Sequence, residues 1–381
     1  MERNNFIFLD STQNYPLEFS AGNSKVEIMA KGLIEQARKV YVINPCFGSR
    51  KISSIIKGEK DGILYKVFPK KGKLYSIYCL FLTLKEMFLM RKEYKYIVYT
   101  QNHYIIYLLE CLYAKLLGYK IGVLYHELRY TTFQKPSLYT LYNAKLFDYT
   151  FGYFCDFILP ISHFLKDRCK KYNKPLLMTP ILSDFSKTKD NVVPKDYFLY
   201  CGSVEYKRII DFILSAFEIL SKQNIDSKLI LVLSGDETVR NSIQKEICNS
   251  GLENNISIKY KLSYDELLKL FSEAKALLIP LDSNNLQDKA RFSQKIAEYV
   301  STKRPIITNS VGEIPYYFND KSAYIAQDTS ATTLSDIMKD VYNNPRKATL
   351  VGKQGYDVGA LYFDYKKYTL SLLSFLKNNY E

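Results

Sequence analysis

The sequence is poor in the residues that mark fibrous, disordered or disulfide-rich proteins. Only 16 of its 381 residues are glycine and 12 are proline, whereas 47% are hydrophobic and 15% aromatic. This composition is that of a globular protein, and the length suggests two domains at roughly 100 to 200 residues each. The seven cysteines are widely spaced in apolar surroundings and form no Cys-x-x-Cys pair. We therefore expect reduced core cysteines rather than disulfides or a metal site.

Long hydrophobic runs are also missing. The apolar stretch Tyr75–Met90 spans 16 residues and contains Lys85 and Glu86, whereas a membrane-spanning helix needs about 20 nearly uncharged residues. The run at 6–9 is too short for an export signal, so we expect the protein in the cytoplasm. Basic residues on both sides of 75–90 fit either a helix lying on an anionic membrane surface or a buried helix with solvated ends.

Acidic residues are scarce in the first half of the chain. The whole sequence has 53 basic and 39 acidic residues, a formal net charge of +14. Residues 1–190 hold 29 basic and 16 acidic side chains, whereas residues 191–381 are nearly balanced at 24 and 23. A basic half favours an anionic partner, and composition alone leaves nucleic acid, an anionic membrane surface and phosphorylated substrates open.

Short β-rich runs alternate with helical periodicity along the whole chain, which is typical of parallel sheets covered by helices. In the first half we expect strands at 6–9, 39–43, 96–99, 120–125 and 157–160, and helices at 26–36, 74–91, 105–117 and after 162. In the second half we expect strands at 197–201, 228–234, 256–260, 276–280 and 305–308, and helices at 207–222, 237–249, 264–275, 292–301 and within 330–379.

The sequence therefore predicts an α/β protein with two Rossmann-like, doubly wound domains facing a cleft. We place the first domain at 1–185 and the second at 195–360, with a polar, proline-terminated linker at 186–194. A C-terminal helix at 361–381 can cross back to the first domain. In such sheets ligands bind at the carboxyl ends of the strands, where the strand order reverses.

Two glycine turns in the second half precede expected helices. The segment Cys201–Arg208 is a glycine turn followed by a helix whose first residues are cationic, and such a helix N-terminus is a natural phosphate site. The alternative for Lys207 is a solvated surface position. The segment Ser234–Glu237 has the same form, but there Asp236 is explained as a helix N-cap.

Two further segments complete the pattern. Arg291, Lys295 and Glu298 are spaced by four and three residues, so they share one helix face. Such a face can meet a diphosphate and a ribose, or it can be an ordinary salt-bridged surface. The segment Asn309–Pro315 is a glycine turn just past the next strand.

Together, these four segments resemble the nucleotide-sugar domain of the GT-B glycosyltransferases, in particular the retaining glycosyl transferases group 1, also called family four, of the bacterial surface-polysaccharide kind. The resemblance implies a nucleotide-diphosphate sugar such as a UDP- or GDP-sugar as donor, with no further cofactor. Lys207 would hold the diphosphate, and Glu298 the ribose hydroxyls. The donor-binding residues that the resemblance implies are Gly202, Lys207, Arg291, Phe292, Ser293, Lys295 and Glu298.

Two positions depart from the family pattern. Ala290 stands where the family has the first of two glutamates separated by seven residues, so the carboxylate often placed near the transferred sugar is absent. Ser203 stands where the family commonly has arginine, so that diphosphate contact falls to Arg291 or Lys295. These departures leave open a catalytically silent GT-B partner subunit, and an inverting GT-B transferase or a nucleotide-sugar epimerase are further alternatives.

The first half resembles the acceptor domain of the same family. The turn containing Gly22 and Asn23 resembles the acceptor-facing glycine turn. His126 and Glu127 resemble the His-Glu pair that ends a strand at the cleft, and they are our candidate catalytic residues; a structural role for each is the alternative. His163 lies in a segment that resembles a helix start of the family, and we expect it to be an N-cap neighbour.

The sequence contains no Asp-x-Asp triplet and no His, Cys and carboxylate cluster with metal-ligand spacing. We therefore expect no metal site, and by resemblance we expect retention of the anomeric configuration. The basic first domain would bind a glycan or lipid-diphosphate-linked acceptor at the inner face of the cell membrane, as a peripheral protein on an anionic surface. No nucleic-acid-binding module is recognisable, so we expect no nucleic-acid partner.

Overall fold

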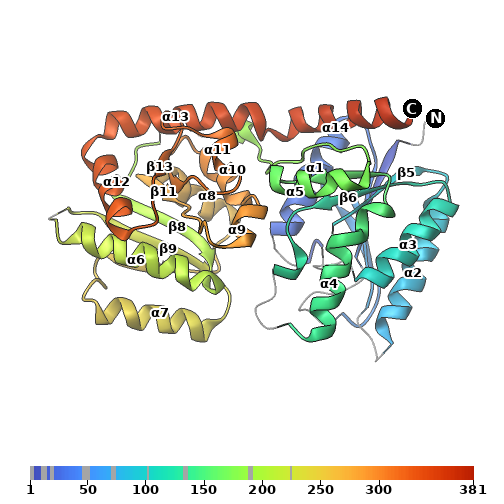
Figure 1. The fold of residues 1–381 in the computed structure, drawn as a ribbon, viewed down its shortest axis with the longest axis horizontal. Coiled ribbons are helices and arrows are strands. Elements are labelled where there is room, and N and C mark those ends of the chain that lie inside the picture. The colour runs from blue at the N-terminus through green and yellow to red at the C-terminus, as the bar shows by residue number, and fades with distance from the viewer. Residues whose placement is uncertain are drawn as a thin grey trace. The chain divides into compact units, whose positions relative to one another are not determined.

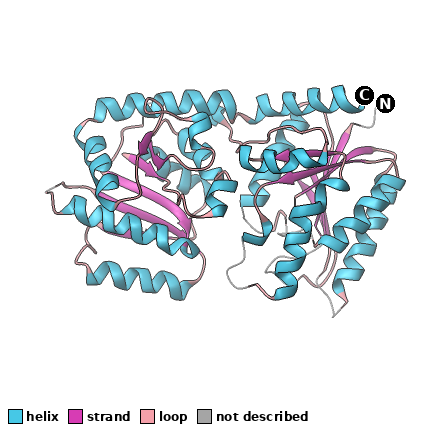
Figure 2. Cartoon of the chain, viewed as in Figure 1, coloured by secondary structure: helices cyan, strands magenta, loops and turns pink. Residues whose placement is uncertain are grey.

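The computed structural model describes residues 4–9, 15–17, 21–44, 52–69, 74–100, 103–131, 136–187, 192–223 and 225–381 (Figures 1 and 2). The chain forms two compact units. The first comprises Met1–Leu182, Ala290–Phe292 and Tyr365–Glu381, and the second comprises Ser183–Lys289 and Ser293–Asp364. Each unit is a sheet with helices on both faces, which confirms the predicted α/β fold class. Part of the linker expected at 186–194 lies outside the described residues.

The sheet of the first unit has the strand order β3-β4-β2-β1-β5-β6-β7. Its strands are β1 (Asn5–Leu9), β2 (Val40–Asn44), β3 (Ile56–Lys60), β4 (Ile63–Val67), β5 (Tyr94–Tyr99), β6 (Lys120–Tyr125) and β7 (Phe157–Pro160). All neighbouring strands are parallel except β3 and β4. Those two form a hairpin around Asp61 and Gly62, which both have positive φ, as a tight Asp-Gly turn requires. The sequence pattern does not predict this hairpin.

Two groups of helices cover this sheet. They are α1 (Ala21–Glu35), α2 (Tyr75–Met90), α3 (Tyr104–Leu116), α4 (Leu138–Thr150), α5 (His163–Cys169) and α14 (Tyr365–Tyr380). α2, α3 and α4 lie side by side on one face, whereas α1 packs against α14 (Figure 1). Short 3-10 turns occur at Arg129–Thr131, Phe151–Tyr153 and Lys170–Tyr172.

The C-terminal helix α14 is an integral part of the first unit. Tyr365, Tyr368 and Leu372 are buried in the same hydrophobic core as the strands. The Tyr368 hydroxyl lies 2.7 Å from the hydroxyl of Thr179, and a methyl group added at Gly32 of α1 would come within 2.0 Å of the Thr369 hydroxyl. The glycine therefore permits the close approach of α1 and α14.

The second unit has the strand order β10-β9-β8-β11-β12-β13, with all neighbouring strands parallel. Its strands are β8 (Tyr197–Ser203), β9 (Lys228–Ser234), β10 (Ile256–Lys259), β11 (Ala276–Leu278), β12 (Ile306–Asn309) and β13 (Tyr324–Ala326). Its α-helices are α6 (Lys207–Ser221), α7 (Glu237–Asn249), α8 (Tyr264–Glu273), α9 (Leu286–Ala290), α10 (Gln294–Val300), α11 (Ile314–Tyr317), α12 (Ala331–Asn343) and α13 (Pro345–Tyr362), with 3-10 turns at Phe185–Lys187 and Val204–Tyr206. From β8 the strands that follow in sequence extend to one side as β9 and β10, and then to the other side as β11, β12 and β13. The boundary between β8 and β11 is the topological switch point of the sheet, and the loops after these two strands flank it.

The six described cysteines are free, as expected, but they are not all core residues. Four are buried, Cys201 is half-buried, and Cys248 is exposed on α7, which corrects the expectation for that residue. Cys46 lies outside the described residues. Within the described ranges, no helix combines the length and the apolar character that a membrane span requires.

Candidate functional site

The candidate site of the second unit lies at the carboxyl ends of β8, β11 and β12. Because these strands are parallel neighbours, the loops that follow them leave the same edge of the sheet. The loop after β8 leads through a 3-10 turn into α6, and the loop after β11 leads through α9 into α10. The sequence motifs predicted to bind a phosphorylated donor therefore meet at one edge.

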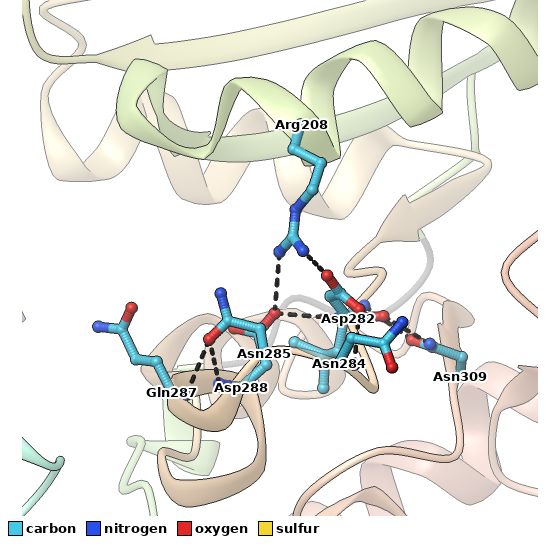
Figure 3. Close-up of polar contacts among 8 residues, drawn as sticks. Arg208, Asp282, Asn284, Asn285, Gln287, Asp288 and Asn309 are labelled. Atoms are coloured by element: carbon cyan, nitrogen blue, oxygen red, sulfur yellow. Dashed lines mark hydrogen bonds and ion pairs between the residues drawn. The ribbon is translucent and has the colours of Figure 1, made fainter. Parts of the chain in front are cut away.

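Arg208, in the first turn of α6, is the cation that reaches across the switch point. Its guanidinium forms an ion pair with Asp282 and lies 3.9 Å from the carboxylate of Asp288 (Figure 3). Asp288 is buried and accepts a hydrogen bond from the Asp282 backbone N–H at 2.9 Å. The Asp282 carboxylate also accepts from the Asn284 N–H at 2.7 Å. The loop after β11 is thus folded around the two carboxylates that hold Arg208 in place.

Asn309, at the end of β12, fixes the other side of this loop. Its buried amide accepts from the Leu281 N–H at 2.7 Å and donates to the Leu281 carbonyl at 2.6 Å. The following turn contains Gly312 with φ of 60°, a left-handed conformation that favours glycine. Asn309 therefore couples the ends of β11 and β12 through two hydrogen bonds.

Helix α10 places Glu298 next to the end of β8. The Tyr299 hydroxyl accepts a hydrogen bond from the Cys201 N–H at 3.0 Å, which anchors the helix to that strand. Burial raises the pKa of Glu298 to about 7, and the Lys295 ammonium opposes the shift. No hydrogen bond or ion pair to the Glu298 carboxyl is found among the described residues. A half-buried carboxyl without such a partner is suited to bind ligand hydroxyls.

Lys207 is oriented differently from the sequence-based prediction. Its ammonium pairs with Asp211 at 2.7 Å and with Glu246 of α7 at 2.8 Å. The side chain thus points along the groove between α6 and α7, while the next residue, Arg208, faces the loop after β11. Consecutive residues of a helix are rotated by about 100°, so only one of the two can face the switch point.

Gly202 has a structural reason to be glycine. A methyl group at this position would come within 2.3 Å of the Tyr200 hydroxyl, which folds over the end of β8. The neighbouring Ser203, which replaces the common arginine of the family, accepts a hydrogen bond from the Glu205 N–H at 3.2 Å. It therefore caps the turn that leads into α6.

The remaining donor-side residues are divided between the two units. Ser293, Lys295 and Glu298 belong to the second unit, whereas Arg291 and Phe292 group with the first unit. In that unit the Ser162 hydroxyl donates to the carbonyl of Ala290 at 2.5 Å, and Ala290 itself is fully buried. Within one unit the structure therefore brings together only part of the predicted set.

In the first unit, His126 follows β6 and contacts a buried lysine that the sequence analysis did not identify. The Lys25 ammonium lies 3.1 Å from His126 Nδ1, and burial lowers the pKa of Lys25 to about 7. Burial and the Lys25 charge also lower the pKa of His126 well below its usual range. An ammonium that donates to Nδ1 leaves the imidazole proton on Nε2, which can then donate to a ligand.

The other first-unit candidates lie near this pair. Gly22 is exposed and Asn23 is buried, both in the first turn of α1, the helix that carries Lys25. Glu127 is half-buried, and its charge acts on Arg129, whose pKa is lowered by burial and partly restored by Asp148 and Glu127. Helix α1 also contains Glu27, Lys31 and Glu35, so Lys25 does not stand out in the sequence, and sequence alone does not distinguish a buried lysine from a solvated one.

Among the residues that the structure describes, no group of three or more His, Cys, Asp and Glu side chains is arranged to hold a metal ion. The candidate site of the second unit therefore consists of an arginine held by two carboxylates, a half-buried glutamate and a helix N-terminus. The first unit, taken by itself, has a lysine-histidine pair. An arginine and a helix N-terminus can bind phosphate oxygens, and a carboxyl group can bind sugar hydroxyls.

Comparison with known proteins identifies the second unit. Residues 184–358 match the family model of glycosyl transferases group 1. Comparison with curated protein sequences finds no match.

Solved structures with the same fold extend over nearly the whole chain. Sucrose-phosphate synthase from Thermosynechococcus elongatus has a TM-score of 0.74 at 14% identity, over 98% of this chain and 99% of that one. HepE from Anabaena in complex with UDP has a TM-score of 0.73 at 13% identity, over 98% and 100%. The pneumococcal O-GlcNAc transferase GtfA, in complex with UDP and GlcNAc, has a TM-score of 0.68 at 10% identity, over 99% of both chains. The chain therefore has the GT-B fold, and its residues 184–358 form a domain of the glycosyl transferases group 1 family.

Proposed function

We propose that the protein transfers a sugar from a nucleotide-diphosphate sugar to a glycan or lipid-linked acceptor in the synthesis of a cell-surface polysaccharide. The observation that carries this proposal is the meeting of Arg208 with the loop after β11 at the switch point of a group 1 domain. Similar structures with bound UDP support a nucleotide-sugar donor.

On the donor side, Arg208 and the N-terminus of α6 would bind the diphosphate, and Glu298 would bind the ribose hydroxyls. We give Arg208 the role that the sequence pattern suggested for Lys207, because Arg208 faces the loop after β11 whereas the Lys207 ammonium lies against Glu246 of α7. A guanidinium is well suited to a diphosphate because its fork of N–H donors binds two oxygens at once. Asp282 and Asp288 would position the guanidinium before the donor arrives.

The reaction breaks the bond between the sugar and the diphosphate, and the leaving diphosphate gains negative charge. Preorganised cations and N–H donors stabilise such charge by several kcal/mol in a site that excludes water. We propose that Arg208 and the helix N-terminus supply this stabilisation without a metal ion. We further propose retention: the acceptor oxygen bonds to the sugar on the face from which the diphosphate leaves, and the hydroxyl proton passes to an oxygen of the leaving diphosphate. His126, with its proton on Nε2, would donate a hydrogen bond to the sugar, and Glu127 would contact the acceptor.

The acceptor would bind to the first unit, near Gly22, Asn23 and His126. The charge surplus of residues 1–190 suits an acceptor that carries a lipid diphosphate, and it suits a location at the inner face of the cell membrane as a peripheral protein. A donor diphosphate needs only a few nearby cations. We therefore assign the excess positive charge of residues 1–190 to binding of the acceptor and of the membrane surface.

A panel of UDP-, GDP-, CDP- and ADP-sugars tests this function directly. We expect one donor to raise the thermal unfolding temperature, because a ligand at 100 times its Kd stabilises the folded state by about 2.7 kcal/mol. The same donor should be consumed in the presence of a membrane extract that contains lipid-linked glycans. Proton NMR of the product then reports the anomer: a retained configuration supports the mechanism, and an inverted one overturns it.

A silent partner subunit is a second candidate, and the identity of residue 290 favours it. Ala290 is fully buried and provides no carboxylate at the position where the family has glutamate. A protein that binds a nucleotide sugar but transfers none with any acceptor would match this candidate. Conversion of the donor into its epimer would instead indicate an epimerase.

A further inference from the structure

Three adjacent helices of the first unit present apolar side chains to solvent. Of the 26 exposed large apolar and aromatic side chains among the described residues, 13 lie on α2, α3 and α4. We call the exposed side of these helices the three-helix face. Its members are Ile77, Tyr78, Phe81, Phe88 and Leu89 of α2, Ile105, Leu109, Leu112 and Leu116 of α3, and Leu138, Tyr139, Tyr142 and Tyr149 of α4.

These side chains recur at helical spacing, with exposed Lys85 between Phe81 and Phe88 on α2 and exposed Lys145 between Tyr142 and Tyr149 on α4. On α3, Ile105, Leu109, Leu112 and Leu116 are spaced by four, three and four residues, which places them on one side of the helix. Leu116 is 83% exposed, so this side faces away from the core. A helix on the surface of a water-soluble domain normally turns its polar side outward, and here the outward side is apolar.

The charges of these helices are sorted by sign. Each helix carries one exposed lysine, namely Lys85, Lys115 and Lys145. Each also carries one carboxylate, and all three are buried: Glu86, Glu110 and Asp148 are at most 5% exposed.

The buried carboxylates have partners inside the unit. Glu86 accepts hydrogen bonds from the Tyr41 hydroxyl at 2.9 Å and from Lys66 at 2.6 Å. Asp148 accepts from the Tyr130 N–H at 3.1 Å. The outward charge of the three helices is therefore entirely positive.

The turn after α2 extends this pattern. Arg91 and Lys92 follow the helix, and the exposed carboxylate of Glu93 is neutralised by an ion pair with Lys39. Basic side chains thus border the apolar side chains at this end of the face.

We propose that the three-helix face docks on the surface of an anionic lipid bilayer. This inference deepens the membrane part of the proposed function and assigns it to specific side chains. Leucine, isoleucine and phenylalanine would enter the boundary between head groups and acyl chains, and the tyrosines would lie at head-group level, where aromatic rings with a polar end accumulate. The lysines would extend their ammonium groups to lipid phosphates.

The charge sorting favours a bilayer over a second copy of the chain. In a two-fold dimer the same surface faces itself. Lys85, Lys115 and Lys145 would then oppose one another, with no carboxylate on the three-helix face to pair with them. An anionic bilayer instead provides both the apolar layer and the negative charge.

Co-sedimentation with vesicles tests the proposal on the full chain. We compare vesicles of phosphatidylcholine with vesicles of equal parts phosphatidylcholine and phosphatidylglycerol, at about 0.1 M salt. The wild-type protein should bind the anionic vesicles and dissociate as salt rises. Replacing Lys85, Lys115 and Lys145 together with glutamine should lower the partition coefficient by roughly a hundredfold, because each basic residue near such a surface contributes about fivefold.

A second variant separates the apolar contribution from the electrostatic one. Phe81→Ser with Leu109→Ser should weaken binding to anionic vesicles while preserving its salt dependence. The matched control is Leu350→Ser with Leu361→Ser, which removes two similarly exposed leucines from α13 of the second unit and should bind vesicles like the wild type. Unchanged unfolding temperatures verify that the variants fold.

Two results overturn the proposal. One is that the triple lysine variant and the Phe81→Ser and Leu109→Ser variant both bind anionic vesicles as strongly as the wild-type protein does. The other is a wild-type dimer, seen by light scattering, that the Phe81→Ser and Leu109→Ser variant converts to monomer without any vesicle binding. Stabilisation by a nucleotide sugar is measured on the same samples. The membrane inference and the donor assignment can therefore fail independently.

Discussion

At the scale of single residues, the structure shows that two neighbouring cations point in different directions, and on that ground we propose Arg208 for the donor site. The sequence places two cations, Lys207 and Arg208, at the start of one helix, and pattern alone does not reveal which faces the sheet edge. The ion pairs give the two directions, since Lys207 contacts α7 and Arg208 contacts the loop after β11. Glu298 stays a prediction, made from sequence because its helix spacing and its family motif agree. Lys25 was not predicted because its burial depends on the packing of the whole unit.

Lys25 predicts a specific dependence of stability on pH. Its pKa is about 7 in the folded protein against an ordinary value of 10.5. Between these values the native state has released a proton that the unfolded state still holds, so the free energy of unfolding rises with pH. The Lys25→Met variant lacks the titrating group. Between pH 7 and pH 9, the free energy of unfolding of the wild-type protein should therefore rise by about 2 kcal/mol relative to that of the variant. Urea unfolding of both proteins at the two pH values measures this gain, and a constant difference would contradict the assignment.

At the scale of elements, the sequence predicts most strands and helices of the sheets but misses those without periodicity. The strands at 120–125 and 228–234 match their predicted bounds because they are buried apolar runs. The hairpin of β3 and β4 was missed because residues 57–60 are exposed and mostly charged, so they carry no hydrophobic alternation. α4 was missed for a related reason, since its outward side is as apolar as its inward side.

The contact between α1 and α14 gives a prediction at this scale. Gly32→Ala should destabilise the protein by about 1 to 3 kcal/mol, because the added methyl group overlaps the Thr369 hydroxyl. Removing that hydroxyl with Thr369→Ala should relieve part of the cost, so the double variant should be more stable than the sum of the single changes predicts. A double-mutant cycle by chemical denaturation measures the coupling. Simple additivity would show that the two helices approach less closely than described.

At the scale of the whole molecule, the C-terminal helix completes the first unit although it follows the second in sequence. Deleting residues 365–381 removes Tyr365, Tyr368, Leu372 and Leu376 from the core of the first unit. We expect the truncated protein to lose the thermal transition of the first unit and to retain that of the second. Calorimetry combined with limited proteolysis measures this outcome. A single thermal transition that moves to lower temperature as a whole would contradict it, because the two units would then unfold together.

The central claim is that Arg208 and the N-terminus of α6 hold the donor diphosphate. Isothermal titration with UDP, or with whichever nucleotide the donor panel selects, tests it most directly when Arg208→Ala is compared with the neighbouring Lys207→Ala. A hydrogen bond to a charged group contributes about 1.5 to 3 kcal/mol, so Arg208→Ala should weaken binding by roughly 10- to 150-fold. Lys207→Ala should bind the nucleotide within about twofold of the wild-type protein, because the Lys207 ammonium lies against Glu246 of α7 and not toward the loop after β11. Equal affinity of the wild-type and Arg208→Ala proteins, or a large loss confined to Lys207→Ala, would contradict the account.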